Sequence, residues 1–188
     1  MACAELGLAN FEGANGLLSA TQHDMERLPM AADWYWRTLI ESALTELWLA
    51  KGELARARPH AENSVKLALA TDERTLQALA LEANARVALA EENLDCVQDS
   101  LAKAIKAMEG FEVPLARWRV DAAAAELHQR LGNQDLANNH RELSRDTIMR
   151  LANSLPTEDP LRHTFLSAPM IRKILGDAET PWLRAKGA

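Results

Sequence analysis

The stretch from Asp72 to Glu91 places the strongest constraint on the fold, because it carries two apolar stripes on one helix. Successive residues of a helix are rotated by about 100° around its axis. On this basis, one stripe consists of Leu76, Ala80, Ala83, Val87 and Ala90, and the opposite stripe consists of Ala78, Leu81, Ala85 and Ala88. A surface helix needs only one apolar stripe. The double stripe therefore predicts a helix sandwiched between neighbours, and Asp72 is placed to cap its N-terminus.

Helical spacing of apolar residues continues on both sides of this stretch, while runs with the period-two alternation of strands are missing. Ala and Leu dominate the composition, and both enter helices at little cost. We therefore predict an all-α fold. Besides the central helix, the predicted helices run over 33–51, 54–70, 94–108, 114–131 and 135–154, followed by two short helical pieces.

The two ends of the chain differ from its middle. Gly7, Gly13 and Gly16 interrupt any helical pattern near the N-terminus, although a short helix there remains compatible with Leu17, Leu18 and Met25. Pro156, Pro160 and Pro169 punctuate the C-terminal part. The predicted organisation is an atypical N-terminal cap or truncated repeat over 1–31, three helix pairs over 33–154, and a proline-containing C-terminal cap over 155–188.

An internal repeat relates the helix pairs. LAKGELARA at 49–57 precedes LAEENLDCV at 89–97 by forty residues, and the turn RLGNQDLA at 130–137 follows at the same interval. The turn residues Gly52, Glu92 and Gly132 are therefore evenly spaced. Leu136 and Leu143 fit a spacing of about forty-two instead, which predicts that the second helix of the third pair slips in register.

Charge and hydropathy exclude several classes of protein. The formal net charge is −6 at pH 7, and no basic field of the kind that nucleic-acid binders use is visible. No stretch approaches the roughly 18 apolar residues of a membrane span, and the N-terminus lacks the basic region of a secretory signal. Cys3 and Cys96 have no partner spacing, so we expect reduced thiols in a cytoplasmic protein that binds neither nucleic acid nor membrane.

No catalytic or metal-binding motif is evident. The five histidines form no HxH, HxxH or HExxH spacing, and no CxxC or GxSxG is present. Each histidine is therefore more economically explained as solvated or half-buried than as a metal ligand. We expect no enzyme activity, no catalytic residue, no bound metal and no cofactor.

Aromatic residues are few but gather around one helix. Trp34, Tyr35, Trp36 and Trp48 are four of the nine aromatic side chains. Consecutive residues point in different directions around a helix, so at most one or two of these could share a groove. Packing in the core and caps is the favoured explanation, and a binding groove is the alternative.

Within each pair, a large–small–large pattern followed by Gly, an acid, Leu and then Ala resembles the tetratricopeptide repeat. The second pair has Glu92 where Gly is usual, and Asn84 where an apolar residue is expected. The matching residues are Leu44, Trp48, Gly52, Glu53, Leu54, Ala57, Ala61 and Ser64, then Ala85, Ala88, Leu94, Leu101 and Ala104, then Ala125, Gly132 and Ala137. The resemblance implies a right-handed superhelical α-solenoid, with helices longer than usual because the period is about forty.

Two segments are similar to a recurrent ending of longer bacterial proteins. FEVPLARWRVDA at 111–122 and SLPTEDPLRHTFLSAPMIRKILG at 154–176 resemble the repeat regions of ATPase-type transcriptional regulators and multidomain adenylate cyclases. No GxxxxGK[ST] nucleotide-binding loop is present. The resemblance implies either the C-terminal repeat arm of such a regulator or a free-standing relative.

In tetratricopeptide arrays the first helices line a concave surface that binds partners. Carried onto this chain, the predicted partner-binding residues are Ser42, Glu46, Leu49, Glu82, Arg86, Leu89, Arg119, Glu126 and Gln129. Mixed charge with flanking leucines suits a peptide or a partner helix, although an ordinary solvated face with i,i+4 pairs is an equal alternative. The leading hypothesis is a protein-interaction and regulatory scaffold. A small-effector sensor and a purely structural oligomerisation module, including a homo-oligomer, remain the alternatives.

Overall fold

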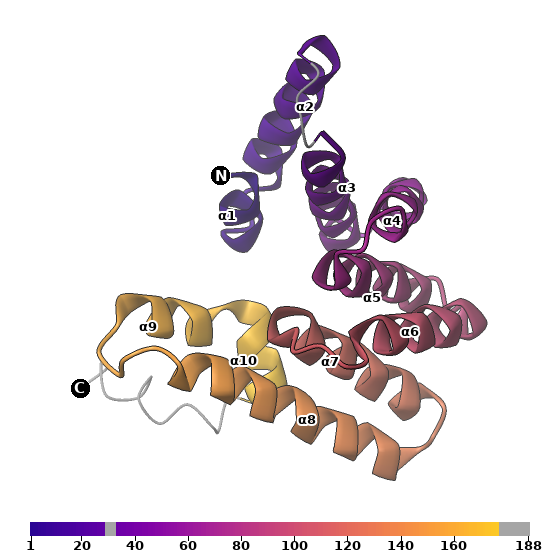
Figure 1. Cartoon of the computed structure of the whole chain (residues 1–188), viewed down its shortest axis with the longest axis vertical. Coiled ribbons are helices and arrows are strands. Elements are labelled where there is room, and N and C mark those ends of the chain that lie inside the picture. Colours follow the sequence, from indigo (N-terminus) through magenta and orange to yellow (C-terminus); the bar gives the residue numbers. More distant parts are fainter. Residues whose placement is uncertain (29–32, 177–188) are drawn as a thin grey trace. The chain divides into compact units, whose positions relative to one another are not determined.

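The computed structural model describes residues 1–28 and 33–176, and these residues form helices joined by short turns and loops, with no β-strand among them (Figure 1). The all-α prediction is therefore confirmed. The chain divides into two compact units, Met1–Ala116 and Arg117–Ala188. The described helices are α1 (Ala2–Gly7), α2 (Phe11–Arg27), α3 (Asp33–Ala50), α4 (Leu54–Leu69), α5 (Arg74–Ala90), α6 (Leu94–Met108), α7 (Pro114–Arg130), α8 (Gln134–Asn153), α9 (Pro160–Ser167) and α10 (Pro169–Leu175).

The N-terminal region is more helical than the sequence suggested. Gly13 and Gly16 lie inside α2, a helix of seventeen residues rather than a short one. Asn10 caps α2 by accepting a hydrogen bond from the Gly13 amide at 3.1 Å. Each glycine lowers helix propensity by about 1 kcal/mol, but burial of Leu18 and Met25 on one face offsets this cost. Residues 29–31 of the predicted cap, and 177–188 at the other end, lie outside the described residues.

The central helix α5 begins one residue later than predicted. Glu73, not Asp72, caps it, because the Glu73 carboxylate accepts hydrogen bonds from the amides of Thr75 and Leu76. A glutamate can reach these amides from the N-cap position only because its longer side chain folds back over the first turn. The prediction of an Asp72 cap was therefore wrong by one residue.

The turns inside the three predicted pairs have one geometry. Gly52, Glu92 and Gly132 all have positive φ, at 73°, 60° and 76°. In each turn the following amide donates to the carbonyl five residues back. These bonds are Glu53 to Trp48, Asn93 to Ala88 and Asn133 to His128, each at 2.9 Å. The forty-residue spacing predicted from the sequence is thus a spacing of identical left-handed turns.

A fourth turn of this kind joins α1 to α2. Ala9 has a φ of 58°, and the Asn10 amide donates to the Glu5 carbonyl at 2.9 Å. Ala14 then occupies the buried position that Ala57 occupies in α4. The offset is forty-three residues rather than forty, and Gly is replaced by Ala, which explains why the repeat is not visible here in the sequence.

The second helices also keep the forty-residue register. They begin at Leu54, Leu94 and Gln134. Buried side chains recur at the same interval, and they are Ala57, Val97 and Ala137, then Ser64, Ala104 and Ser144, then Ala68, Met108 and Ile148. The predicted slip of α8 is therefore wrong. Leu136 and Leu143, which suggested it, are exposed apolar residues outside the packed face.

In the first unit, α5 packs against α3, α4 and α6. Both of its apolar stripes are buried apart from the exposed terminal residue Ala90, so the sandwiched helix is confirmed. Each helix contacts the next along the chain from α1·α2 to α5·α6, and in addition α1 contacts α3 and α3 contacts α5. Within this unit, the alternate helices α1, α3 and α5 therefore contact one another in order.

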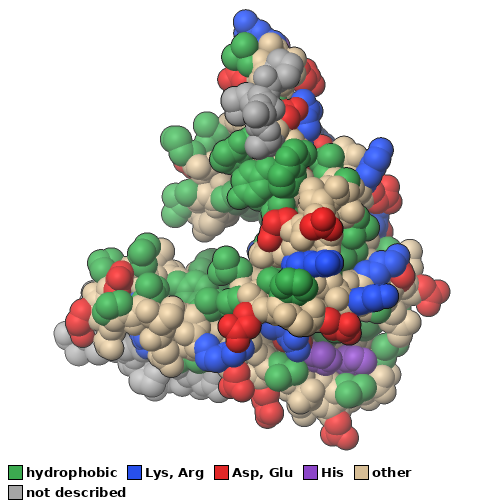
Figure 2. Space-filling model, in the orientation of Figure 1, with side chains coloured by type: hydrophobic (Ala, Val, Ile, Leu, Met, Phe, Trp, Pro, Cys, Tyr) green, Lys and Arg blue, Asp and Glu red, His purple; other side chains and the backbone are tan. Residues whose placement is uncertain are grey.

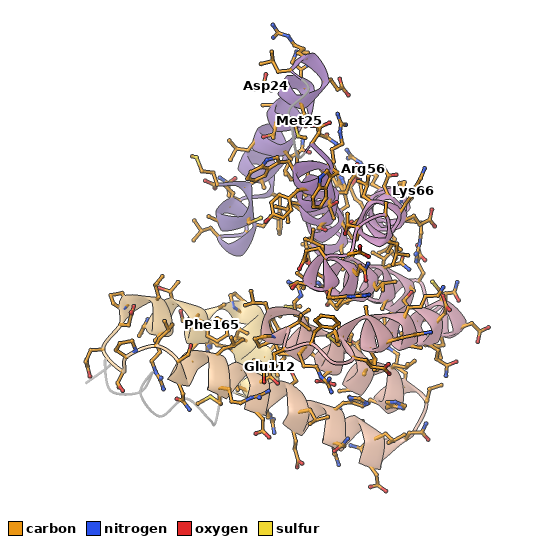
Figure 3. The ribbon with its side chains drawn as sticks, in the orientation of Figure 1. Asp24, Met25, Arg56, Lys66, Glu112 and Phe165 are labelled. Atoms are coloured by element: carbon orange, nitrogen blue, oxygen red, sulfur yellow. The ribbon has the colours of Figure 1, made fainter. Side chains whose placement is uncertain are left out.

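In the second unit, α8 contacts both α9 and α10. Its core contains Trp118, Ile148, Leu166 and Ile171. Phe165, on α9, packs at the edge of this core (Figure 3). The short helices of the C-terminal part are thus an integral part of this unit's core.

Candidate functional site

Three of the predicted partner-binding residues meet between α3 and α5. Arg86 on α5 donates from Nη1 to Glu46 Oε1 on α3 at 2.5 Å, and its Nε lies 3.7 Å from Glu82 Oε1. Arg86 and Glu46 are half-buried, whereas Glu82 is buried. Glu82 was expected on an exposed polar edge, so the structure places it one layer deeper than predicted.

The other three predicted residues of the first unit are less open. Ser42 turns toward α4, where its Oγ lies 2.8 Å from Ser64 Oγ. Leu49 is partly buried against the core, and Leu89 is buried. Of the six predicted positions in this unit, Glu46 and Arg86 are those with charged atoms at the surface of the first helices.

The remaining predicted residues belong to the second unit. Glu126 is exposed and pairs with Arg130 at 2.7 Å, and Gln129 accepts a hydrogen bond from Arg141 on α8. Arg119 is half-buried, with its guanidinium carbon 5.8 Å from the ring of Trp118. Each of the three has partners within its own unit, and their role in binding stays a prediction.

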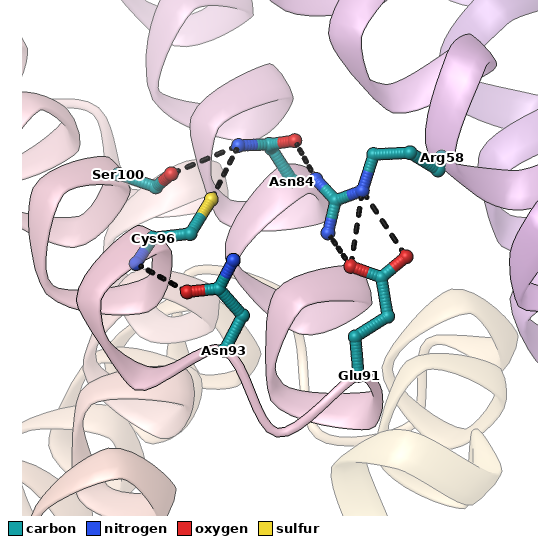
Figure 4. Close-up of polar contacts among 6 residues, drawn as sticks. All are labelled: Arg58, Asn84, Glu91, Asn93, Cys96 and Ser100. Atoms are coloured by element: carbon teal, nitrogen blue, oxygen red, sulfur yellow. Dashed lines mark hydrogen bonds and ion pairs between the residues drawn. The ribbon is translucent and has the colours of Figure 1, made fainter.

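A polar network that the sequence did not reveal connects α4, α5 and α6 (Figure 4). Arg58 holds Glu91 through Nε, at 3.1 and 3.2 Å, and donates from Nη1 to Asn84 Oδ1 at 2.8 Å. The amide of Asn84 in turn donates to Ser100 Oγ at 2.9 Å and approaches Cys96 Sγ at 3.8 Å. The hydrogen bonds to Glu91 raise the pKa of Arg58 above its ordinary value.

This network explains Asn84, which departs from the tetratricopeptide pattern. Its side chain uses both amide atoms, one toward Arg58 and the other toward Ser100. A half-buried amide with both atoms paired can take the place of an apolar side chain without leaving polar atoms unsatisfied. Sequence spacing gave no sign of this contact, because Arg58 and Asn84 lie twenty-six residues apart.

Two acid–histidine contacts were also missed. Glu41 Oε2 lies 2.7 Å from His60 Nδ1, and Asp121 Oδ1 lies 3.0 Å from His140 Nδ1. Both pairs join the two helices of a pair across nineteen residues, and the two contacts are eighty residues apart, which is two repeat periods. Aligning the polar residues at the forty-residue period could have found them.

The second of these contacts extends to a second histidine. Asp121 is buried and also accepts from Arg117 Nε at 2.8 Å. The ring of His128 stacks on that of His140, with centroids 5.5 Å apart and an interplanar angle of 7°. Burial, and then the charge of His140, lower the pKa of His128. The cluster is a site where protonation changes local charge.

Among the described residues, no group of three or more His, Cys, Asp or Glu is arranged to hold a metal ion. None of the described helices combines the length and the apolarity that crossing a bilayer requires. Comparison of the chain with protein-family models, curated proteins and solved structures found no match.

Proposed function

We propose that this chain is a protein-interaction scaffold of the tetratricopeptide kind, and that it binds a peptide or a partner helix on the surface of its first helices. The observation that carries the proposal is the contact of α1 with α3 and of α3 with α5. Stacked first helices produce a continuous preformed surface. The four turns of one geometry support the same repeat.

The Glu46–Arg86 pair is the proposed centre of this surface. Both side chains are half-buried, so they are partly desolvated and their direction is fixed before a partner arrives. A carboxylate of the partner would take the place of Glu46 on the planar guanidinium, while the apolar stem of Arg86 packs against it. Glu82, buried beneath Arg86, would keep the guanidinium in position.

A role as the repeat arm of a signalling or transcriptional regulator follows as the biological setting of this proposal. Such arms contribute binding surface rather than chemistry. The small-effector sensor and the structural module are the competing functions. They are distinguished by what the purified chain retains, because a sensor would carry a stoichiometric small molecule and a scaffold would carry a polypeptide.

The test starts by identifying, by mass spectrometry, the polypeptide that co-purifies with the chain, and then measures its affinity by calorimetry. Arg86→Gln should weaken binding at least about tenfold, because it removes the charged anchor. Arg86→Glu is a poorer variant, since it would place a third carboxylate beside those of Glu46 and Glu82. Lys103→Gln, which breaks an exposed ion pair with Asp99 on α6, is the matched control.

Two results would count against the proposal. Equal affinity of the parent and Arg86→Gln would remove the α3–α5 surface as the binding site. Recovery of a stoichiometric small molecule without any polypeptide would favour the sensor instead.

A further inference from the structure

Three aromatic side chains are exposed together at the start of α3. Trp34, Tyr35 and Trp36 are 46%, 37% and 47% exposed, although packing in the core or caps was the favoured expectation for them. Their rings meet edge to face, with centroids 5.8 Å apart for Trp34 and Tyr35 and 5.3 Å apart for Tyr35 and Trp36. Trp48, later in the same helix, is buried. The first three form what we call the aromatic patch.

The first helix that precedes α3 is much shorter than α3 itself. The shared turn geometry aligns α1, which has six residues, with the last six residues of the eighteen-residue α3. On the side of α3 that faces α1, a first helix therefore lies along only its C-terminal third within the described part of the chain. The other twelve of its eighteen residues, about 18 Å of helix, extend beyond the end of α1.

The charge of the first unit selects the kind of helix that fits. Residues 1–116 hold 18 of the 27 Asp and Glu residues and 10 of the 21 Lys and Arg residues, a net charge of −8, whereas residues 117–188 sum to +2. Residues 1–50 alone hold seven acids and two arginines. Figure 2 shows Asp and Glu side chains among Lys and Arg side chains at this end of the unit, and Asp24 lies near the end of α2 (Figure 2, Figure 3).

Other aromatic rings of this chain already carry a cation. The guanidinium carbon of Arg56 lies 3.2 Å from the ring centroid of Trp48, and that of Arg74 lies 5.3 Å from Phe111. The rings of Trp34, Tyr35 and Trp36 form no such contact with the residues that the structure describes. Cation–π attraction is strongest over Trp, so these rings favour contact with Lys or Arg side chains of another molecule.

We propose that the aromatic patch docks a basic amphipathic helix of a partner protein, in the position that a longer first helix would occupy beside α3. Leucines of the partner helix cover the rings, and its Lys or Arg side chains lie over the ring faces and toward the acidic surface. This site is separate from the Glu46–Arg86 surface of the proposed function. Charge complementarity identifies the occupant, because an acidic or neutral apolar helix would meet the same rings without that attraction.

The probe is a fluorescently labelled synthetic helix of leucine and lysine, about 14 residues or four turns long, with a leucine–glutamate peptide of the same pattern as its opposite. Anisotropy titrations should show that the leucine–lysine peptide binds and the leucine–glutamate peptide does not. The double variant Trp34→Ala/Trp36→Ala should bind the basic peptide at least about tenfold more weakly. Raising the salt from about 50 to about 500 mM should also weaken binding.

Leu69→Ala is the matched control, because Leu69 is an exposed apolar residue of the same unit on α4, and it should bind as the parent does. Tyr35→Arg adds a positive charge, which repels the lysines of the basic peptide, without removing either tryptophan. It too should weaken the binding of this peptide. Circular dichroism of each variant establishes that its helices are intact.

Three outcomes would overturn the proposal. Equal binding of the two peptides would make the patch merely apolar, and unchanged affinity in the double variant would move the site elsewhere. Sedimentation that shows a dimer of the parent and a monomer of the double variant would assign the patch to a second copy of this chain. None of these outcomes depends on Arg86, so the two proposals can fail separately.

Discussion

The helix pairs α3–α4 and α7–α8 use the same acid–histidine contact in different surroundings. In the first, the side chains of Glu41 and His60 are 14% and 28% exposed. In the second, those of Asp121 and His140 are 2% and 18% exposed. Because a shorter acid lies deeper and also binds Arg117, the same position in the repeat changes from a half-open contact to the centre of a buried polar cluster.

A second position shows the same contrast. Trp48 and His128 lie eighty residues apart, which is two repeat periods, and each lies two residues before the last residue of its helix, α3 or α7. Trp48 is buried beneath Arg56, whereas His128 stacks on His140. The comparison teaches that the repeat fixes the backbone and the turn, while the contacts between the two helices of a pair can be apolar, ionic or titratable.

The largest expected effect comes from removing the two acids. Asp121→Ala should lower the free energy of unfolding by about 3 kcal/mol, because it leaves His140 and Arg117 without their buried acceptor. Glu41→Ala should cost about 1 kcal/mol, since its partner is closer to solvent. Urea unfolding followed by circular dichroism measures both. Equal losses would show that burial does not distinguish the two pairs.

Sequence reasoning succeeded where one residue type determines one local structure. Gly52 and Gly132 indicated the turns between helices, and the two apolar stripes of Ala, Leu and Val in α5 indicated a helix buried on two sides. It failed where tertiary packing decides. Burial of Leu18 and Met25 maintains α2 through two glycines, and exposed leucines imitated a register shift in α8.

The candidate site was predicted less well than the fold, for a physical reason. Periodicity tells which face of a helix a residue occupies, and the resemblance to the tetratricopeptide repeat selected Glu46 and Arg86 as lining residues of two first helices. It does not tell how deep that face lies, which is why Glu82 and Leu89 are buried against expectation. Contacts between helices, such as Arg58 with Asn84, depend on the helix–helix approach and leave no local pattern.

The second-largest effect is expected from substitutions in the turns, which test whether the turns of the helix pairs are equivalent although the polar contacts between their helices differ. Glu92 adopts the left-handed conformation that Gly52 and Gly132 adopt freely. A side chain there costs about 1 kcal/mol, so Glu92→Gly should stabilise the chain by about 0.5–1 kcal/mol. Gly52→Ala should destabilise it by about 1 kcal/mol, although a methyl group there would meet no atom within 4 Å.

Thermal unfolding of these two variants provides the measurement. If Glu92→Gly leaves the melting midpoint unchanged while Gly52→Ala lowers it, the middle turn has a compensating contact of its own. The three pairs would then differ in their turns as well as in their polar contacts.

The smallest effect concerns His128, which gives α7–α8 a pH dependence that Trp48 cannot give α3–α4. The pKa of His128 is lowered from its ordinary value of 6.5, first by burial and then by His140, and its Nδ1 is buried without a hydrogen-bond partner among the described residues. His128 is therefore protonated more readily in the unfolded chain than in the folded chain. The contribution of neutral His128 to the free energy of unfolding is complete above pH 6.5, and it is lost as the pH falls from there toward the lowered pKa.

His128→Phe keeps a ring to stack on His140 and removes the titration. The free energy of unfolding should therefore fall less between about pH 7.5 and about pH 5.5 in this variant than in the parent. His23→Gln, which removes an exposed histidine on α2, should retain the parental slope. A parental slope in His128→Phe would mean that other groups carry the pH dependence, and the stacked pair would then be a packing contact like Trp48 with Arg56.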